Sequence, residues 1–406
     1  MGVLFAVGIF VAIVCKEASS ASTATARSAV EPQVDVSTTQ IVQAFVVRQG
    51  GLKLATIMSI FRHGDRTPDE EELILFPTEE KINKNIFFPY GMKALTNKGK
   101  QRGFAVGKYL RKRYDDLISK LYLPDEINVR TTSYARTKMT ALTALAALYP
   151  PPPAQKWNPA LDWQPVPYDT EKYETDDLMY WYTCPRYIKL RNAAYQEPEI
   201  IEWLKPYQDL IVYLRDKTGT NITTAEDVFY FDNLLQTLKN VGVNPPQWVS
   251  DVWPRIREVT KVEYAAEFYT PELIRLASGS LMNDILNYTS YFIAGDSEQP
   301  KLRLYSAHEN NVAALLAASR VFQPHQPSYG ATFSLELRKA RSDGQYYIAA
   351  VYSKDAGGPA KILPVEGCGG GTLCKYDQFV SLVISFTPYL LSKGSEKEEG
   401  KYKRKG

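Results

Sequence analysis

Five segments of the chain have the hydrophobic pattern that is typical of buried β-strands. The first, LKLATIMSIF at 52–61, is hydrophobic almost without interruption, as in a strand covered on both faces of a parallel sheet. Shorter strands are predicted at 127–132 (INVRTT) and 300–307 (PKLRLYSA). ATFSLELRK at 331–339 and QYYIAAVYSK at 345–354 predict a hairpin around RSDGQ.

Helical patterns follow three of these strands. Residues 92–118 carry a hydrophobic stripe that includes Leu95 and Phe104, although glycines interrupt it. SYARTKMTALTALAALYP at 133–150 has a serine near its start and a proline at its end. ENNVAALLAASRVF, at 309–322, follows the third strand. Strands that alternate with helices predict an α/β fold.

The middle of the chain, 151–296, departs from this alternation. It opens with PPPAQKW, contains aromatic clusters such as MYWYTC, and has the pattern of helices with irregular connections. We therefore expect an α/β core in two parts, 52–150 and 297–391, separated by a mostly helical insertion. The charged residues 392–406 form a tail.

The amino-terminal segment has the pattern of a secretory signal. A continuous hydrophobic run at 3–15 precedes small residues, so we expect a signal peptide at 1–22 and a poorly ordered lead-in at 23–51. An uncleaved anchor is the alternative, but a membrane span needs about 20 residues. NIT at Asn221 and NYT at Asn287 are candidate glycosylation sites, which suits an exported chain.

Composition narrows the range of partners. The 406 residues include 48 Lys and Arg against 45 Asp and Glu, a formal charge of +3, which is too weakly basic to indicate a nucleic-acid partner. With 27 Tyr, 16 Phe and 6 Trp, aromatic side chains suffice for a large core or a ring-lined pocket. The hydrophobic run at 379–391 is too short for a bilayer and contains Pro388, so no stable membrane span is expected after signal cleavage.

The four cysteines indicate an oxidising compartment more than a metal site. Cys15 lies within the predicted signal. Cys368 and Cys374 flank GGGTL, a flexible loop that a local disulfide would close. Cys184 is then left over, either buried and free or in competition for one of these two partners. The cysteines and the three histidines show no metal-ligand spacing, so no metal is expected.

Three strand–loop–helix junctions place charged side chains at the carboxyl ends of predicted strands. Ligands bind at such ends in open α/β sheets, so we expect the junctions to converge. The residues are Arg62, His63 and Arg66 in RHGDR, Arg136 in YART, and His308 and Glu309 in AHE. Arginines and helix amino termini bind tetrahedral oxyanions, a histidine can act as a nucleophile, and a carboxyl group can donate a proton. Together they predict a phosphate pocket.

Each of these motifs also has a purely structural interpretation. RHGDR alone fits a surface turn, and His325, in QPHQPSYG, has no basic neighbours and is interpreted as an ordinary loop histidine. Arg130 is expected to brace the pocket, Gly64 to let the backbone approach the anion, and Asp65 to orient the loop. The acidic run DEEE at 69–72 is expected to be a solvated rim. Chemistry is favoured because two of the three histidines fall at strand ends beside suitable partners.

FRHGDRTP resembles the signature of the histidine acid phosphatases, a branch of the histidine phosphatase superfamily. The similarity continues over 52–384, through LTNKGKQRGFAVGKYLRKRY, VRTTSYARTKMTALTALAALYPP, CPRY, LMNDILNY, YSAHENN and the GC…C loop. The chain is most similar to the prostatic and lysosomal acid phosphatase group, including insect secreted and venom members. The resemblance implies a phosphoglycerate mutase-like, three-layer α/β/α core with a mostly helical cap insertion.

The same resemblance implies roles for individual residues. His63 is the nucleophile that becomes phosphohistidine, and Glu309 protonates the leaving alcohol. The phosphate oxygens are held by Arg62, Arg66, Arg136 and His308. The implied substrates are phosphate monoesters, either small molecules or phosphoproteins, and no cofactor is involved. The implied location is the extracellular space or the lysosome, and a homodimer is one state to expect, as in some relatives.

The sequence departs from the family pattern at three points. Glu309 stands where the group usually has Asp, and RTTSYART lacks the acidic residues common between its arginines. No cysteine follows Cys374 to pair with Cys184, which favours a free Cys184. Two alternatives stay open: a secreted venom or salivary binding protein with reduced catalysis, and a phytase-like inositol polyphosphate phosphatase. The acidic EKYETDD at 171–177 counts against the phytase, since such substrates need many cations.

Overall fold

The computed structural model describes residues 51–296 and 298–388. The predictions for residues 1–50 and 389–406, which include the signal peptide, Cys15 and the charged tail, lie outside the described residues.

A mixed eight-stranded sheet forms the centre of the fold, in the order β3-β2-β4-β1-β5-β6-β7 with β8 paired to β6. The strands are β1 (Leu52–Arg62), β2 (Ile127–Thr131), β3 (Asp169–Thr170), β4 (Leu302–Ala307), β5 (Thr332–Ala340), β6 (Tyr346–Ser353), β7 (Ala360–Leu363) and β8 (Cys374–Lys375). The first four run parallel, and β5 to β8 pair antiparallel. The five predicted strands are confirmed to within two residues at each end.

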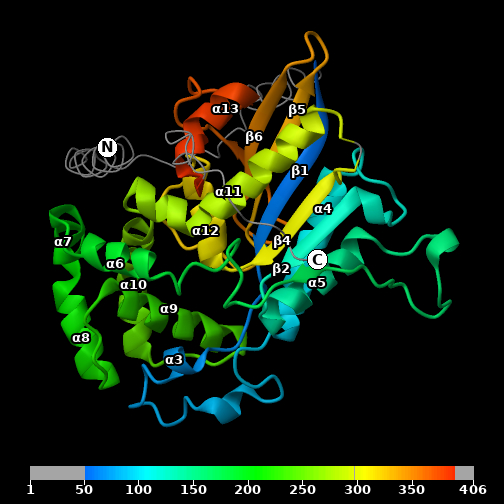
Figure 1. The fold of residues 1–406 in the computed structure, drawn as a ribbon. Coiled ribbons are helices and arrows are strands. Elements are labelled where there is room, and N and C mark those ends of the chain that lie inside the picture. Colours follow the sequence, from blue (N-terminus) through cyan, green and yellow to red (C-terminus); the bar gives the residue numbers. More distant parts are fainter. Residues whose placement is uncertain (1–50, 297, 389–406) are drawn as a thin grey trace, which may run out of the picture. The chain divides into compact units, whose positions relative to one another are not determined.

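Helices cover both faces of this sheet, which gives three α/β/α layers (Figure 1). One face packs against α4 (Asn97–Arg113) and α5 (Ala135–Leu148), and the other against α11 (Pro271–Ile293), α12 (Glu309–Ala318) and α13 (Tyr376–Val383). In β1, Ile57 and Phe61 join the core with α4 and α5, whereas Met58 and Ile60 join the other. The uninterrupted hydrophobic run of β1 therefore reflects burial on both faces.

Most of the region between β2 and β4 is helical. It contributes α6 (Pro185–Ala194), α7 (Pro198–Leu204), α8 (Gln208–Thr218), α9 (Ala225–Asn240), α10 (Gln247–Glu267) and the α11 helix of the outer layer. A separate hydrophobic core joins α8, α9 and α10 with Phe76 and Phe87 from the segment after β1. The short helix α3 (Glu70–Leu73) of that segment packs against α9. The insertion also supplies β3, which extends the sheet beside β2.

Helix α4 is shorter than the predicted helix at 92–118. It begins at Asn97, where the Thr96 side chain accepts a hydrogen bond from the Gly99 amide. Its glycines form a buried face toward α5: a Cβ on Gly107 would overlap the carbonyl of Ala144. The glycines that weaken the helical pattern therefore allow the backbones of α4 and α5 to approach closely.

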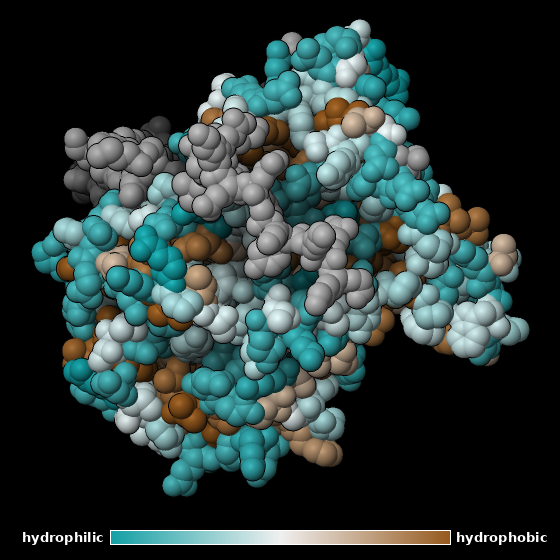
Figure 2. All heavy atoms as spheres, in the orientation of Figure 1, coloured by the Kyte–Doolittle hydropathy of each residue, from teal (hydrophilic) through white to brown (hydrophobic). Residues whose placement is uncertain are grey.

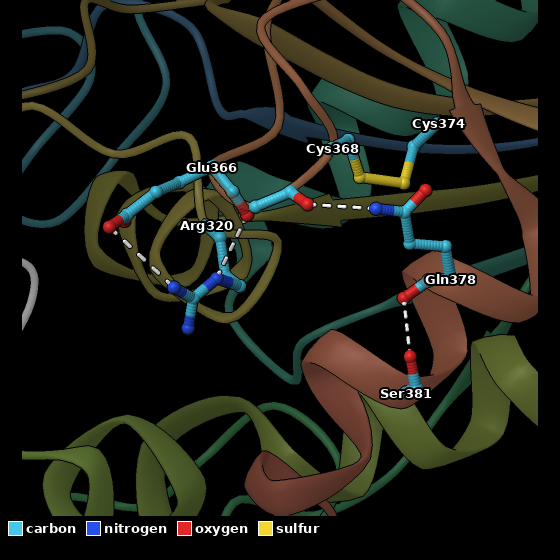
Figure 3. Close-up of a disulfide and its surroundings, with 7 residues drawn as sticks. Arg320, Glu366, Cys368, Cys374, Gln378 and Ser381 are labelled. Atoms are coloured by element: carbon cyan, nitrogen blue, oxygen red, sulfur yellow. Dashed lines mark hydrogen bonds and ion pairs between the residues drawn. A yellow bond between two sulfur atoms is a disulfide. The ribbon is translucent and has the colours of Figure 1, made fainter.

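Two of the cysteines form the predicted disulfide at the loop between β7 and β8. Cys368 and Cys374 form a disulfide, with their Cα atoms 5.3 Å apart (Figure 3). Cys184 is free, at the start of α6. Beside the disulfide, the Arg320 side chain donates to the Glu366 carbonyl at 3.1 Å and so ties this loop to the end of α12.

The exposed residues of the described part of the chain are mostly hydrophilic on the face shown in Figure 2. Hydrophobic residues form small separate patches there. No helix among the described residues has the length and hydrophobicity needed to cross a membrane. The candidate glycosylation residues Asn221, between α8 and α9, and Asn287, on α11, are both exposed.

Candidate active site

The register of the parallel strands brings the three predicted junctions side by side. Arg62, the last residue of β1, is opposite Ala307, the last residue of β4. On the other side of β4, Ser306 is opposite Thr131, the last residue of β2. The His63 amide continues this pairing by donating to the Ala307 carbonyl at 2.9 Å. The segments that follow all three strands therefore start at one edge of the sheet.

His63 is buried with a defined tautomer. Its Nδ1 lies 2.8 Å from the carbonyl oxygen of Gly64, and a carbonyl only accepts hydrogen bonds, so Nδ1 carries the proton. The unprotonated Nε2 lies 4.0 Å from a carboxylate oxygen of Glu309. Burial lowers the pKa of His63 well below its usual value, and Arg136, His308, Arg62 and Arg66 lower it further. His63 is therefore a neutral base with a free lone pair, even in mild acid.

Arg62 is fully buried and incompletely paired. Its Nη1 donates to the Pro327 carbonyl at 2.7 Å, and its guanidinium carbon lies 3.9 Å from the centre of the Tyr329 ring. Its Nε lies 2.9 Å from Glu309 Oε2, but that contact lacks hydrogen-bond geometry. Nε and Nη2 thus have no hydrogen-bond partner among the described residues. An unpaired buried donor is costly, so this position suits an incoming anion.

Two acidic residues hold the other two arginines. The prediction of a solvated rim at 69–72 is confirmed for Glu70 and Glu71, which are exposed, and is wrong for Asp69 and Glu72. Glu72 is 2% exposed and takes two hydrogen bonds from Arg66, at 2.7 and 2.6 Å. Asp69 accepts from Arg136 at 3.3 Å. The composition of DEEE suggested solvent, but Asp69 caps α3 and turns Glu72 inward. The Nε atoms of Arg66 and Arg136 still lack partners within the described part of the chain.

His308 caps the amino terminus of α12. Its Nε2 lies 3.0 Å from the hydroxyl of Thr132, and its ring meets that of Tyr134 edge-on, with centres 5.0 Å apart. The His308 amide donates to the Asn311 side chain at 3.1 Å. The His308 and His63 rings lie 5.4 Å apart. Burial lowers the pKa of His308 well below its usual value, and Arg136 adds to the effect.

Glu309 is the first residue of α12 and is buried beside Arg62. Burial alone would raise the pKa of its carboxyl, but Arg62, Arg66 and Arg136 together outweigh burial and lower it. Beside these arginines Glu309 is therefore a carboxylate. An anion bound next to the arginines would offset their charge and raise the pKa of Glu309.

Asp65 and Gly64, the remaining residues of the first junction, hold the loop against α4. Asp65 is buried and forms ion pairs with Arg102 and Lys98 of α4, which anchors the loop as expected. Gly64 differs from expectation: a Cβ there would overlap the Gly99 carbonyl, so the glycine permits contact with α4 and is not explained by approach to an anion.

Arg130 and His325 lie away from the junction chemistry. Arg130 donates to the buried Asp176 at 2.7 Å, which braces the segment after β3. His325 bonds to the Gln323 carbonyl at 2.6 Å and the Tyr352 hydroxyl at 2.8 Å, as a structural loop histidine would.

A cavity of about 240 Å³ opens above this edge of the sheet. Its lining includes residues at and near the junctions, namely Arg66, Asp69, Glu72, Tyr134, Arg136, His308 and Glu309. The second group of lining residues comes from α6, α9, α10, the segment before α6 and the first turn of α12: Met179, Tyr180, Tyr182, Arg191, Glu226, Phe229, Tyr230, Asn233, Glu267, Asn310 and Asn311. We call the second group the outer wall. The predicted acidic character of this pocket is present, but it comes from Glu226 and Glu267 and not from 171–177.

Sequence reasoning missed several residues of the site. Asp69 and Glu72 follow the capping pattern of an acidic residue three positions before Glu, which would have indicated a helix start. Tyr134 lies in the recognised YART segment. No local signal marks Tyr329, which reaches Arg62 from a loop far along the chain. Among the described residues, no group of three or more His, Cys, Asp or Glu side chains is arranged to hold a metal ion.

An α/β/α fold with a neutral buried histidine and converging arginines is the arrangement expected of a phosphate-binding site. The chain belongs to the histidine phosphatase superfamily (branch 2), whose sequence profile matches residues 53–353. It is 30% identical over 339 residues to venom acid phosphatase Acph-1 of Apis mellifera, in an alignment that covers 83% of this chain and 86% of the relative. It is 32% identical over 349 residues to prostatic acid phosphatase of Bos taurus, covering 84% and 87%.

Solved structures of more distant proteins share the fold. The apo form of Hafnia alvei phytase superposes with a TM-score of 0.62 at 13% sequence identity, over 83% of this chain and 98% of that one. At this identity the likeness concerns the fold alone.

Proposed function

We propose that the chain is an acid phosphatase that hydrolyses phosphate monoesters through a phosphohistidine at His63. The observation that carries the proposal is the neutral His63, with Nε2 unprotonated, beside buried arginine nitrogens that lack partners among the described residues. Phosphate oxygens would satisfy these donors, and the arginine charge replaces the metal ion used by other phosphatases. The acid phosphatase names of the relatives support the same activity.

The proposed reaction has two steps. His63 Nε2 attacks phosphorus, the bond to the leaving oxygen breaks, and protonated Glu309 gives that oxygen its proton. Water then attacks the phosphohistidine and gives a proton to the Glu309 carboxylate, which releases inorganic phosphate and restores His63. Throughout, the phosphate oxygens are held by Arg62, Arg66, Arg136 and His308. Glu309 would fill the position of the usual Asp because it lies 4.0 Å from Nε2.

We also propose an exported or lysosomal location. The support is the predicted signal at 1–22, the exposed sequons at Asn221 and Asn287, the disulfide, and the names of two relatives, the venom enzyme of Apis mellifera and lysosomal acid phosphatase of Xenopus laevis, which is 30% identical over 337 residues. The homodimer suggested by the family resemblance stays a prediction.

The test of the proposed activity is the His63→Ala variant, assayed with p-nitrophenyl phosphate at acid pH. We expect the loss of the nucleophile to reduce kcat by roughly three orders of magnitude or more. Mass spectrometry after quenching wild type at alkaline pH should find the phosphoryl group on the peptide that contains His63. His325→Ala is the matched control, since this histidine bonds only to loop and strand residues. Normal turnover by His63→Ala would exclude the mechanism.

A further inference from the structure

The outer wall of the cavity contains more carboxyl groups than cations. Arg191 of α6 pairs with Glu226 at 2.8 Å and with Glu263 at 2.6 Å. Glu263 also takes hydrogen bonds from the Tyr195 hydroxyl. Glu267, one helical turn further along α10, lines the cavity itself. Two glutamates therefore share one guanidinium, and Glu267 has no ion pair of its own among the described residues.

Glu267 is the member of this group that is left unpaired. It is 4% exposed, and its Oε1 accepts from the Tyr182 hydroxyl at 3.1 Å. Its Oε2 has no hydrogen-bond partner within the described residues. Burial raises the pKa of Glu267 to about 8, because the lowering by Arg191 does not offset the burial and the neighbouring Glu263 raises the pKa further. A buried carboxyl that lines a cavity and has one oxygen without a partner points to a ligand group that supplies one.

The position of Glu267 places this ligand group on the leaving-group side. The Tyr182 hydroxyl, which donates to Glu267, accepts a hydrogen bond from Asn310. Asn310 follows Glu309, the proposed proton donor. Through Tyr182 and Asn310, Glu267 is thus connected to the turn of α12 that carries the proposed proton donor.

The chemistry of the outer wall selects the kind of group. Carboxylates with aromatic faces bind ammonium groups, through ion pairs and through attraction of the cation to the ring. Tyr182, Phe229 and Tyr230 supply aromatic side chains in the same wall. Arg191, the one cation of the outer wall within the described residues, is already paired twice. A leaving group that carries further phosphates would be repelled by the carboxyl groups of the outer wall. An ammonium would instead supply positive charge and a hydrogen-bond donor to Glu267.

We propose that the outer wall is a specificity site for a cationic leaving group, with Glu267 binding the ammonium of an amino-alcohol phosphate monoester. The inference rests on the proposed phosphatase function and deepens it. Glu267 acts here as a substrate-binding residue and takes no part in the phosphoryl transfer. Inositol polyphosphates are expected to be poor substrates, because their further phosphates would lie beside the carboxyl groups of the outer wall.

The experiment compares aminoalkyl phosphates with hydroxyalkyl phosphates of equal chain length, in a series of increasing length, and p-nitrophenyl phosphate as reference. For wild type we expect kcat/KM to favour the aminoalkyl member by roughly tenfold or more at the best length. In Glu267→Gln, which keeps the size and the acceptor for Tyr182, the preference should fall to within about twofold of unity. Glu199→Gln is the matched control, because Glu199 accepts from Tyr269 at 3.4 Å outside the cavity.

The outcomes separate the two proposals. No turnover of p-nitrophenyl phosphate by wild type would overturn the proposed function and this inference with it. Turnover without a preference for the ammonium, or a preference that survives in Glu267→Gln, would overturn the inference alone. If Glu267→Gln does not fold, inhibition of wild type by aminoalkyl phosphonates against hydroxyalkyl phosphonates decides the matter. Equal inhibition by the two would contradict the ammonium site.

Discussion

Arg66 and Glu72 form a bidentate ion pair in which Nη1 and Nη2 each donate to a different carboxylate oxygen, at 2.7 and 2.6 Å. Both side chains are buried, and Arg66 Nε is left without a partner among the described residues. Such a fork fixes the plane of the guanidinium. Glu72 therefore fixes the orientation of Arg66, whereas the neighbouring Glu70 is exposed and pairs with Lys93.

Glu72→Gln should lower the free energy of unfolding and increase the stabilisation that phosphate provides. Replacing the carboxylate leaves Arg66 as a buried charge without its counterion, which costs about 3 kcal/mol of unfolding free energy. Bound inorganic phosphate supplies part of the missing negative charge, so it should raise the urea midpoint more for the variant than for wild type. Glu71→Gln is the control, since its side chain is 70% exposed. Equal midpoints for both variants would show that Glu72 is not required.

Glu309 should take up a proton when phosphate binds. The arginines lower its pKa in the empty site, and the charge of phosphate opposes them, so the pKa of Glu309 rises on binding. Between the two pKa values binding is coupled to proton uptake, and phosphate affinity increases as the pH falls. Calorimetry at about pH 5, near the usual range of Glu, in buffers of different ionisation enthalpy measures this uptake.

The Glu309→Gln variant isolates the contribution of this carboxyl, because protons taken up by phosphate itself are common to both proteins. We expect the variant to take up fewer protons than wild type. It should also lose more activity on alkyl phosphates than on p-nitrophenyl phosphate, whose leaving group needs little protonation. The same uptake in both proteins, or equal losses on both substrates, would remove Glu309 from the role of acid.

The imidazoles of His63 and His308 should stay neutral in mild acid. Burial lowers both pKa values, with Arg136 the next contribution. The unfolded chain protonates these groups near pH 6.5 and the folded chain does not, so the unfolding free energy decreases as the pH falls below about 6.5. Because the chain has three histidines, carbon-13 labelling and single substitutions assign each resonance. A titration of His63 with a midpoint near its usual value would contradict the predicted neutral nucleophile.

The parts of the site that the sequence predicts are those with a local pattern. The β1 run and the residue types after it are contiguous, so the positions of His63 and Arg62 follow from one strand and its end. The composition of the acidic run does not reveal that Glu72 is buried, although its spacing from Asp69 is that of a helix cap. Glu267 had no local signal, since its importance depends on the packing of α6, α9 and α10. Tertiary contacts of this kind are set by the whole fold.

Gly64 also has a role that only the tertiary packing reveals, and Gly64→Ala tests it. The added Cβ would overlap the carbonyl oxygen of Gly99, and backbone atoms on both sides cannot move without displacing α4 from the loop that carries His63. We expect a loss of about 3 kcal/mol in unfolding free energy by urea titration, and a lower kcat because the carbonyl of Gly64 fixes the His63 tautomer. Gly51→Ala, whose Cβ would meet no atom within 4 Å, should change neither. A fully stable and active Gly64→Ala protein would show that the loop and α4 are not in tight contact.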